Sequence, residues 1–312
     1  MVNIEVGVQT MTSYPDTLAL AEWAESEGLA ALAVADHYLT GTDTTYALDQ
    51  IVVLGAVAAR TERIQLSTLV SPITFRHPAV MLKSAVTLDE ISGGRFTLGI
   101  GTGWMEEEHE RFGFDLPPLD ERFERLTEAL EYIEAARDDD GQGFAGRHYR
   151  LASGPMPEPR GDGLRLVVGG SGPRRTPALA GRFADEYNAF PGPHPFGPRI
   201  EAARASAREA GRDADHLAIS AAFPLVMGED RAEAAARIEA VAARRGVDVD
   251  RVRTRYGEMG IPVGTVDEVL TAVEAMAADG VERVYFQVAF DPLEDIRHSI
   301  DLLRRHGLTA SG

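Results

Sequence analysis

The stretch Phe96–Trp104, FTLGIGTGW, and the stretch Leu164–Arg175, LRLVVGGSGPRR, indicate the fold of this 312-residue chain. Each begins as an apolar strand, ends in glycines and leads into a helix-like segment. A strand that ends in glycines before a helix N-terminus presents free backbone N–H groups to an anion. Glycines also mark ordinary tight turns between strands and helices, which is the plain alternative for either stretch alone. Together, and with Arg174 and Arg175 at a helix start, the two stretches favour a cofactor site with a phosphate.

Composition excludes several classes of protein. The chain has 31 basic and 49 acidic residues, a formal net charge of −18, which argues against nucleic acid or an anionic membrane as a partner. It has no cysteine, so disulfides, thiolate catalysis and cysteine-bound metals are excluded. The first residues do not resemble a signal peptide, and no apolar stretch is long enough to span a membrane. We therefore expect a cytoplasmic protein with a single domain over residues 1–312.

Strand-like and helix-like segments alternate along the chain, which is the pattern of parallel βα units. Eight such strands fit a (β/α)₈ TIM barrel with insertions, the longest after strand four, and a doubly wound open sheet is the alternative. The expected strands are Ile4–Thr10, Leu32–Asp36, Ile64–Val70, Phe96–Gly101, Leu164–Val168, Glu186–Phe190, Leu217–Met227 and Val284–Val288.

Helices are expected between these strands. Ser13 with Asp16, and Thr265 with Glu268, have the spacing of capping boxes. The insertion after strand four should hold a charged helix and a short hairpin around Phe144–Leu151. The expected helices are Thr17–Glu27, Tyr46–Arg60, Pro78–Ile91, Leu119–Arg137, Thr176–Phe183, Ile200–Ala210, Ala232–Arg245, Val266–Ala278 and Leu293–Arg305.

Polar residues and glycines follow the apolar strands, at the end where barrel enzymes carry their active sites. Asp36 and His37 stand side by side after strand two, so they could orient one another, and a histidine exchanges protons near neutral pH. The alternative is a helix-capping aspartate beside an exposed histidine. The strand ends are Gln9-Thr10, Asp36-His37, Val70-Ser71, Gly101–Trp104, Gly169–Gly172, Asn188 and Gln287.

Several common motifs are absent from the chain. The glycine spacing at 99–103 is not the Rossmann G-x-G-x-x-G, and no acidic strand end follows about twenty residues later. No H-E-x-x-H and no G-x-S-x-G occurs, so neither a zinc protease nor a serine hydrolase is indicated. The acidic run Glu106–Glu110 is interpreted as a solvated loop or helix start rather than a metal site, and we expect no metal.

An ordered set of segments resembles the bacterial luciferase-like family, and more closely its branch of coenzyme F420-dependent oxidoreductases. Flavin mononucleotide (FMN) monooxygenases share the Ser-Gly-Gly-Arg and Gly-x-Gly-x-Gly parts. The resemblance runs over nearly the whole chain, and its segments are Asp36-His37, Ser71–Pro78, Leu88–Phe96, Gly99–Trp104 and Gly169–Arg175.

The resemblance implies a barrel that binds a flavin or 5-deazaflavin at the carboxyl ends of its strands. Asp36 and His37 would lie by the ring system, with His37 as proton donor or acceptor. Leu69 and Val70 match the place where relatives carry a bulge with a non-prolyl cis peptide behind the rings. The remaining cofactor-binding residues would be Gly101, Thr102 and Gly103 along the ribityl-phosphate chain, and Gly169, Gly170, Ser171, Gly172, Arg174 and Arg175 around the phosphate.

The expected function is hydride transfer between C5 of F420 and an unidentified small organic substrate. The alternatives are a monooxygenase that uses reduced FMN from a partner reductase, and a non-catalytic flavin-binding protein. Trp104 replaces the catalytic glutamate of the glucose-6-phosphate dehydrogenases of this branch, so it either lines the substrate face or is an ordinary buried tryptophan. We expect the substrate pocket to include Gln9, Trp104 and His109, the acidic tail of F420 to meet Arg76, Arg174 or Arg175, and the protein to be a homodimer.

Overall fold

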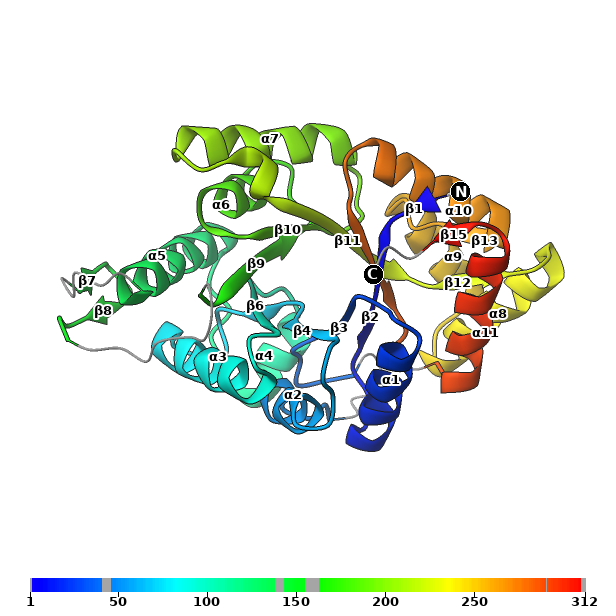
Figure 1. Ribbon diagram of the computed structural model, residues 1–312, viewed down its shortest axis with the longest axis horizontal. Coiled ribbons are helices and arrows are strands. Elements are labelled where there is room, and N and C mark those ends of the chain that lie inside the picture. The colour runs from blue at the N-terminus through cyan, green and yellow to red at the C-terminus, as the bar shows by residue number, and fades with distance from the viewer. Residues whose placement is uncertain (1, 41–45, 138–142, 155–162, 290, 310–312) are drawn as a thin grey trace.

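A computed structural model of the chain describes residues 2–40, 46–137, 143–154, 163–289 and 291–309. Within these residues, eight parallel strands surround one axis, and helices lie outside them (Figure 1). Pairing runs β4-β3-β2-β14-β11-β10-β9-β6, and β4 also pairs with β6, which closes the barrel. The barrel strands are β2 Glu5–Thr10, β3 Ala31–Val34, β4 Gln65–Thr68, β6 Phe96–Gly101, β9 Arg165–Gly170, β10 Glu186–Ala189, β11 Ala218–Pro224 and β14 Arg283–Gln287.

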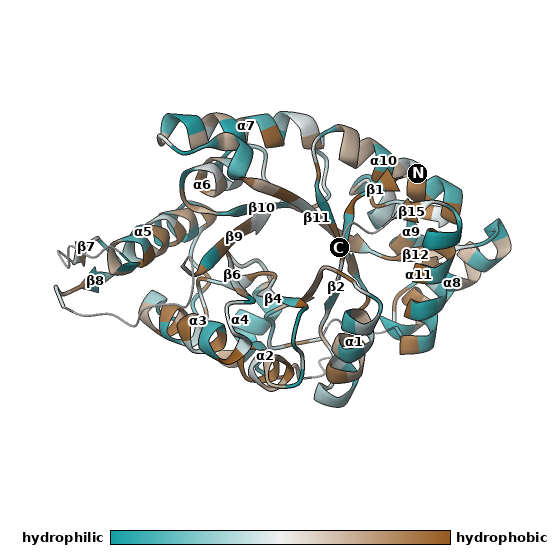
Figure 2. Ribbon diagram, in the orientation of Figure 1, coloured by the Kyte–Doolittle hydropathy of each residue, from teal (hydrophilic) through white to brown (hydrophobic). Residues whose placement is uncertain are grey.

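This closed barrel confirms the predicted fold, and the open doubly wound sheet is wrong. Most strands are buried on both faces, as expected where helices cover a parallel sheet. The large apolar core lies between strands and helices, while a small separate cluster fills the barrel interior, including Ala33, Leu69, Val167, Ala222 and Tyr285. Apolar colour accordingly gathers on the strands and on parts of the helices (Figure 2).

Several helices begin where the sequence supplies a capping side chain. The side chain of Ser13 accepts the N–H of Asp16, and Thr265 and Glu268 form the predicted capping box. The described helices are α1 Tyr14–Ser26, α2 Gln50–Ala58, α3 Pro78–Ser92, α4 Glu106–Phe112, α5 Leu119–Arg137, α6 Arg175–Phe183, α7 Phe196–Glu209, α8 Arg231–Arg244, α9 Val249–Glu258, α10 Val266–Ala278 and α11 Leu293–Arg305.

Strand three is divided into β4 and the short β5, Ser71–Pro72, which pairs with β6. The two residues between them are joined by a cis peptide bond, Leu69-Val70. This confirms the non-prolyl cis peptide that the resemblance implies at the end of strand three.

The region after strand seven differs from the expectation, whereas the hairpin predicted after strand four is present. Strand seven was predicted as one element, Leu217–Met227, but Val226–Gly228 forms β12, which leaves the barrel and pairs with β13, Val263–Thr265. The helix α9 was not predicted. After strand four, the predicted hairpin is confirmed as β7 Phe144–Ala145 and β8 Arg150–Leu151.

The predicted helix Tyr46–Arg60 starts too early. The observed α2 begins at Gln50 because the side chain of Asp49 accepts the N–H groups of Ile51 and Val52. At the ends of the chain, β1 Val2–Asn3 pairs with β15 Leu308–Thr309. Among the described helices, none combines the length and the apolar character that a membrane span requires.

Candidate functional site

Asp36 and His37 follow β3 at the carboxyl end of the barrel, as predicted, but their side chains have different partners. The Asp36 side chain is 3 % exposed. Ser71 Oγ donates to its Oδ2 at 2.7 Å, and Arg76 Nη1 donates to the same oxygen. Asp36 therefore anchors Ser71 and Arg76, and the expectation that it orients His37 is wrong.

Arg76 is held between two carboxylates. Besides its bond to Asp36, its Nη2 donates to Asp49 Oδ2 at 2.9 Å. Burial opposes the charge of Arg76, but the carboxylates of Asp36 and Asp49 outweigh burial and raise the pKa of Arg76. Because both of these nitrogens are engaged inside the protein, Arg76 is poorly placed to bind an acidic cofactor tail.

His37 is paired with Glu108, a residue that the sequence analysis assigned to a solvated acidic run. His37 Nδ1 lies 2.9 Å from Glu108 Oε1, and the other oxygen, Oε2, accepts the N–H of Tyr38 at 2.8 Å. The Glu108 side chain is 1 % exposed, whereas that of His37 is 16 % exposed. The run Glu106–Glu110 does start a helix, α4, but that helix turns one of its carboxylates inward. The position of Glu108 just after the strand-four glycines is the one sequence signal that could have suggested this.

Trp104 and His109, both predicted in the substrate pocket, lie in different environments. Trp104 is 61 % exposed, and its ring meets the His37 ring edge-on, with the ring centroids 5.8 Å apart. The alternative interpretation, that Trp104 is an ordinary buried tryptophan, is therefore wrong. His109 is buried, with Nδ1 2.7 Å from the Met105 carbonyl oxygen and Nε2 2.8 Å from Thr74 Oγ1. Both ring nitrogens of His109 are thus engaged within the protein, and its contact with substrate stays a prediction.

The glycines at the ends of strands four and five make room for Val70. A Cβ placed on Gly101 would lie 2.7 Å from Val70 Cγ2, and one on Gly169 would lie 2.9 Å from Val70 Cγ1. A Cβ on Gly99 would lie 1.9 Å from the Thr68 carbonyl oxygen. These three glycines are therefore explained by close packing around strand three, a reason that the sequence analysis did not give.

Gln9, predicted in the substrate pocket, joins the end of strand one to strands three and eight. Its Nε2 donates to the Leu69 carbonyl oxygen, and its Oε1 accepts from Gln287 Nε2 at 2.6 Å. Asn188, another strand-end residue, donates instead to Ser220 in the barrel interior at 2.8 Å. Gln9 and Gln287 thus lie together at the rim.

The second glycine stretch leads into α6, whose first residue is Arg175 and whose N-cap is Arg174. The backbone approaches the helix closely here, because a Cβ on Gly170 would lie 3.2 Å from Thr176 Oγ1 and one on Gly172 would lie 3.5 Å from it. Ser171 and Arg174 are exposed. A helix N-terminus behind glycines is suited to an anion such as a phosphate.

Two of the predicted cofactor-binding residues, Arg175 and Gly103, contact side chains of α5. Arg175 donates to Asp120 at 2.6 Å and lies over the Phe123 ring, 4.0 Å from its centroid. Arg122 donates to the carbonyl oxygen of Gly103, which has a φ of +76°, while Thr102 beside it is half-buried. The helix α5 of the insertion therefore contacts both glycine stretches.

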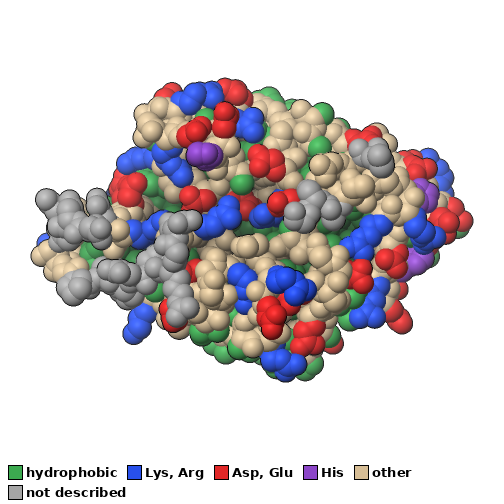
Figure 3. All heavy atoms as spheres, viewed as in Figure 1, with side chains coloured by type: hydrophobic (Ala, Val, Ile, Leu, Met, Phe, Trp, Pro, Cys, Tyr) green, Lys and Arg blue, Asp and Glu red, His purple; other side chains and the backbone are tan. Residues whose placement is uncertain are grey.

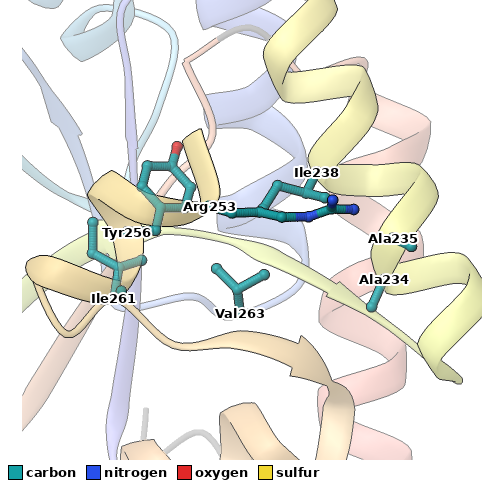
Figure 4. A pocket seen from close by; sticks show the side chains of 8 residues that line it. Ala234, Ala235, Ile238, Arg253, Tyr256, Ile261 and Val263 are labelled. Carbon is teal, nitrogen blue, oxygen red and sulfur yellow. The ribbon is translucent and has the colours of Figure 1, made fainter. Parts of the chain in front are cut away.

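A pocket of about 360 Å³ lies between α8, α9 and β13, and none of the predicted site residues lines it (Figure 4). The pocket is lined by Ala234, Ala235, Ile238, Arg253, Tyr256, Gly257, Ile261 and Val263.

On the face shown in Figure 3, acidic and basic side chains are interspersed. Among the described residues, no group of three or more His, Asp or Glu side chains is placed to hold a metal ion.

Comparison with known proteins gives consistent matches. A family model described as luciferase-like monooxygenase matches residues 2–283. An F420-dependent glucose-6-phosphate dehydrogenase of Nakamurella multipartita is 34 % identical over 209 residues, covering 65 % of this chain and 61 % of the relative. A 4-hydroxyprotoasukamycin monooxygenase of Streptomyces nodosus subsp. asukaensis is 32 % identical over 180 residues, covering 56 % of this chain and 45 % of the relative. The chain thus spans less than two thirds of these curated relatives.

A solved structure agrees with the barrel over nearly the whole chain. The coenzyme F420-dependent tetrahydromethanopterin reductase of Methanopyrus kandleri superposes with a TM-score of 0.76 at 20 % identity, covering 98 % of this chain and 99 % of the reductase. At this identity, the likeness shows the fold.

Proposed function

The chain belongs to the luciferase-like monooxygenase family, and from this premise we propose that it is a coenzyme F420-dependent oxidoreductase acting on a small organic substrate. The observation that carries the proposal is the His37–Glu108 pair beside the exposed Trp104. An imidazole fixed at one nitrogen, at the carboxyl end of a barrel, is suited to proton transfer. The F420-dependent relative from Nakamurella supports the choice of cofactor.

The residues present fit such a cofactor at two places. The glycine turn before α6 would hold the phosphate through backbone N–H groups of residues 170–172, with the exposed Arg174 nearby. Thr102 and Gly103 would contact the chain between phosphate and rings, and Leu69 and Val70 would lie behind the rings. Gly101 and Gly169 serve this proposal by leaving room for Val70.

When bound, F420 supplies hydride transfer at its ring. His37 would hold or release the accompanying proton at Nε2, because Nδ1 is engaged with Glu108. Trp104 would cover the substrate face, and Gln9 would border it. Asp36 acts in this proposal through Ser71 and Arg76, which it fixes, and a direct contact between Asp36 and the ring system stays a prediction.

An FMN-dependent monooxygenase is the second candidate. The similarity to 4-hydroxyprotoasukamycin monooxygenase favours it, and it would require a partner reductase to supply reduced flavin. For either activity we propose a homodimer, because Val52 on α2 and Val80 and Ile91 on the adjoining α3 expose apolar side chains that a second copy would cover.

Titration of the purified protein with F420 and with FMN separates the two enzymes. We expect F420 to bind with a Kd on the order of 1 μM or tighter and to bind more weakly in added salt. His37→Ala should weaken the binding of F420 more than the binding of FMN. Gly170→Val should weaken the binding of both cofactors, because the larger side chain fills the space before α6. Tight FMN binding with oxygen consumption and no F420 binding would overturn the proposal in favour of the monooxygenase.

A further inference from the structure

Glu108 is the buried acidic residue of α4 that contacts His37, and both of its carboxylate oxygens are used. Oε1 faces His37 Nδ1 at 2.9 Å, and Oε2 accepts the N–H of Tyr38 at 2.8 Å. A backbone N–H can only donate, so the oxygen facing Tyr38 must be an acceptor. The orientation of the Glu108 carboxylate is thereby fixed by the backbone next to the histidine it contacts.

We propose that Glu108 is a positioning residue that sets the tautomer of His37, with the proton on Nδ1 and the lone pair on Nε2. An ionised carboxylate has no proton to donate, so Nδ1 must donate to it. Asp36 does not compete for His37, since its carboxylate is taken by Ser71 and Arg76. This inference rests on the proposed function, in which Nε2 of His37 exchanges a proton with substrate.

The surroundings of His37 leave Nε2 for that role. No side chain or backbone group of the described residues forms a hydrogen bond with Nε2, and the ring contacts the exposed Trp104 edge-on. Among the described residues, Glu108 is the carboxylate that pairs with this histidine. Glu108 comes from the insertion after strand four, so that insertion orients a residue that follows strand two.

Glu108→Gln tests the inference because an amide has one accepting end and one donating end. The Tyr38 N–H requires the amide oxygen, so the NH₂ group is left facing His37 Nδ1. Nδ1 must then accept, and the proton moves to Nε2. The substitution keeps the size of the side chain and reverses the tautomer.

The measurement is a long-range ¹H–¹⁵N NMR spectrum of the full-length, ¹⁵N-histidine-labelled protein at alkaline pH, with the His37 signals assigned from His37→Ala. We expect the Nδ1–H tautomer in the wild type and in Glu108→Asp, and the Nε2–H tautomer in Glu108→Gln. Glu107→Gln is the matched control, because Glu107 is an exposed carboxylate on the same helix. His109, whose Nδ1 faces the Met105 carbonyl oxygen, should keep its Nδ1–H tautomer in every variant.

The activity readout follows the same logic. With F420 bound, Glu108→Gln should lower kcat at least about tenfold, because it removes the basic nitrogen of His37 from the proton-transfer step.

An Nε2–H tautomer in the wild type, or an Nδ1–H tautomer retained in Glu108→Gln, would overturn the inference. If Glu108→Gln does not fold, the wild-type and Glu108→Asp spectra still decide it. A protein that shows the tautomer change but binds no F420 would contradict the proposed function and leave the role of Glu108 standing.

Discussion

Arg95 offers a test of how the structure is stabilised, independent of any ligand. It follows the Ser-Gly-Gly segment and is 8 % exposed. Its guanidinium donates to the carbonyl oxygens of Ser92, Ile64, Ala58 and Thr61 and to the Thr61 hydroxyl, at 2.7 to 3.0 Å. Some of these carbonyls lie at the ends of α2 and α3, where a cation is favourable. Burial lowers the pKa of Arg95, yet arginine stays protonated at any practical pH.

Arg95→Met removes the guanidinium and keeps most of the stem. Each buried carbonyl left without a partner costs about 1–3 kcal/mol, and removing the buried charge recovers part of that cost. We therefore expect the free energy of unfolding to fall by about 3–5 kcal/mol. Arg95→Lys, which keeps the charge but has fewer donors and no planar fork, should lose about half as much.

Urea unfolding followed by circular dichroism measures these differences. Arg60→Met is the matched control, because Arg60 is mostly exposed and pairs with an exposed Glu22, so its removal should cost about 0.5 kcal/mol or less. An Arg95→Met protein within about 1 kcal/mol of the wild type would refute the assignment of Arg95 as the bond donor that holds these chain segments together.

Two further predictions concern stability. Gly99→Ala should destabilise the protein by about 3 kcal/mol or more in urea unfolding, because the new Cβ would lie 1.9 Å from the Thr68 carbonyl oxygen. The control Gly257→Ala, in open space on α9, should be neutral or stabilising by up to about 1 kcal/mol. Equal effects of the two substitutions on the free energy of unfolding would contradict the packing argument. Glu25 is partly buried, which opposes its charge, but the backbone N–H groups of residues 62–64 outweigh burial and lower its pKa. The contribution of Glu25 to the free energy of unfolding is therefore fully present above the ordinary glutamate pKa of about 4.3. That contribution is lost as pH falls through the lower pKa of the folded protein. Glu25→Gln should therefore be less stable than wild type at pH 7 and approach it in acid, and a constant difference across pH would be inconsistent with this.

The candidate site was predicted from sequence only in part. His37, Trp104 and the glycine stretches do lie at the carboxyl ends of strands, because that placement follows from the alternation of strands and helices. Glu108 was missed since a run of four glutamates and a histidine has no apolar pattern to show which member turns inward. The beginning of α2 was placed too early, at Tyr46, whereas the Asp49 cap sets the start at Gln50.

The sequence by itself determined the barrel, the helix caps at Ser13 and Thr265 and the chain segments that form the rim of the barrel. Apolar periodicity, glycine stops and cap spacing act within a few residues, so they can be recognised without knowing the neighbours in space. Only the tertiary structure decided the partners: Glu108 for His37, Arg76 for Asp36, and Gly101 and Gly169 around Val70. Each of these contacts joins residues from different strands and insertions, and its geometry exists only once barrel closure brings those segments to one rim.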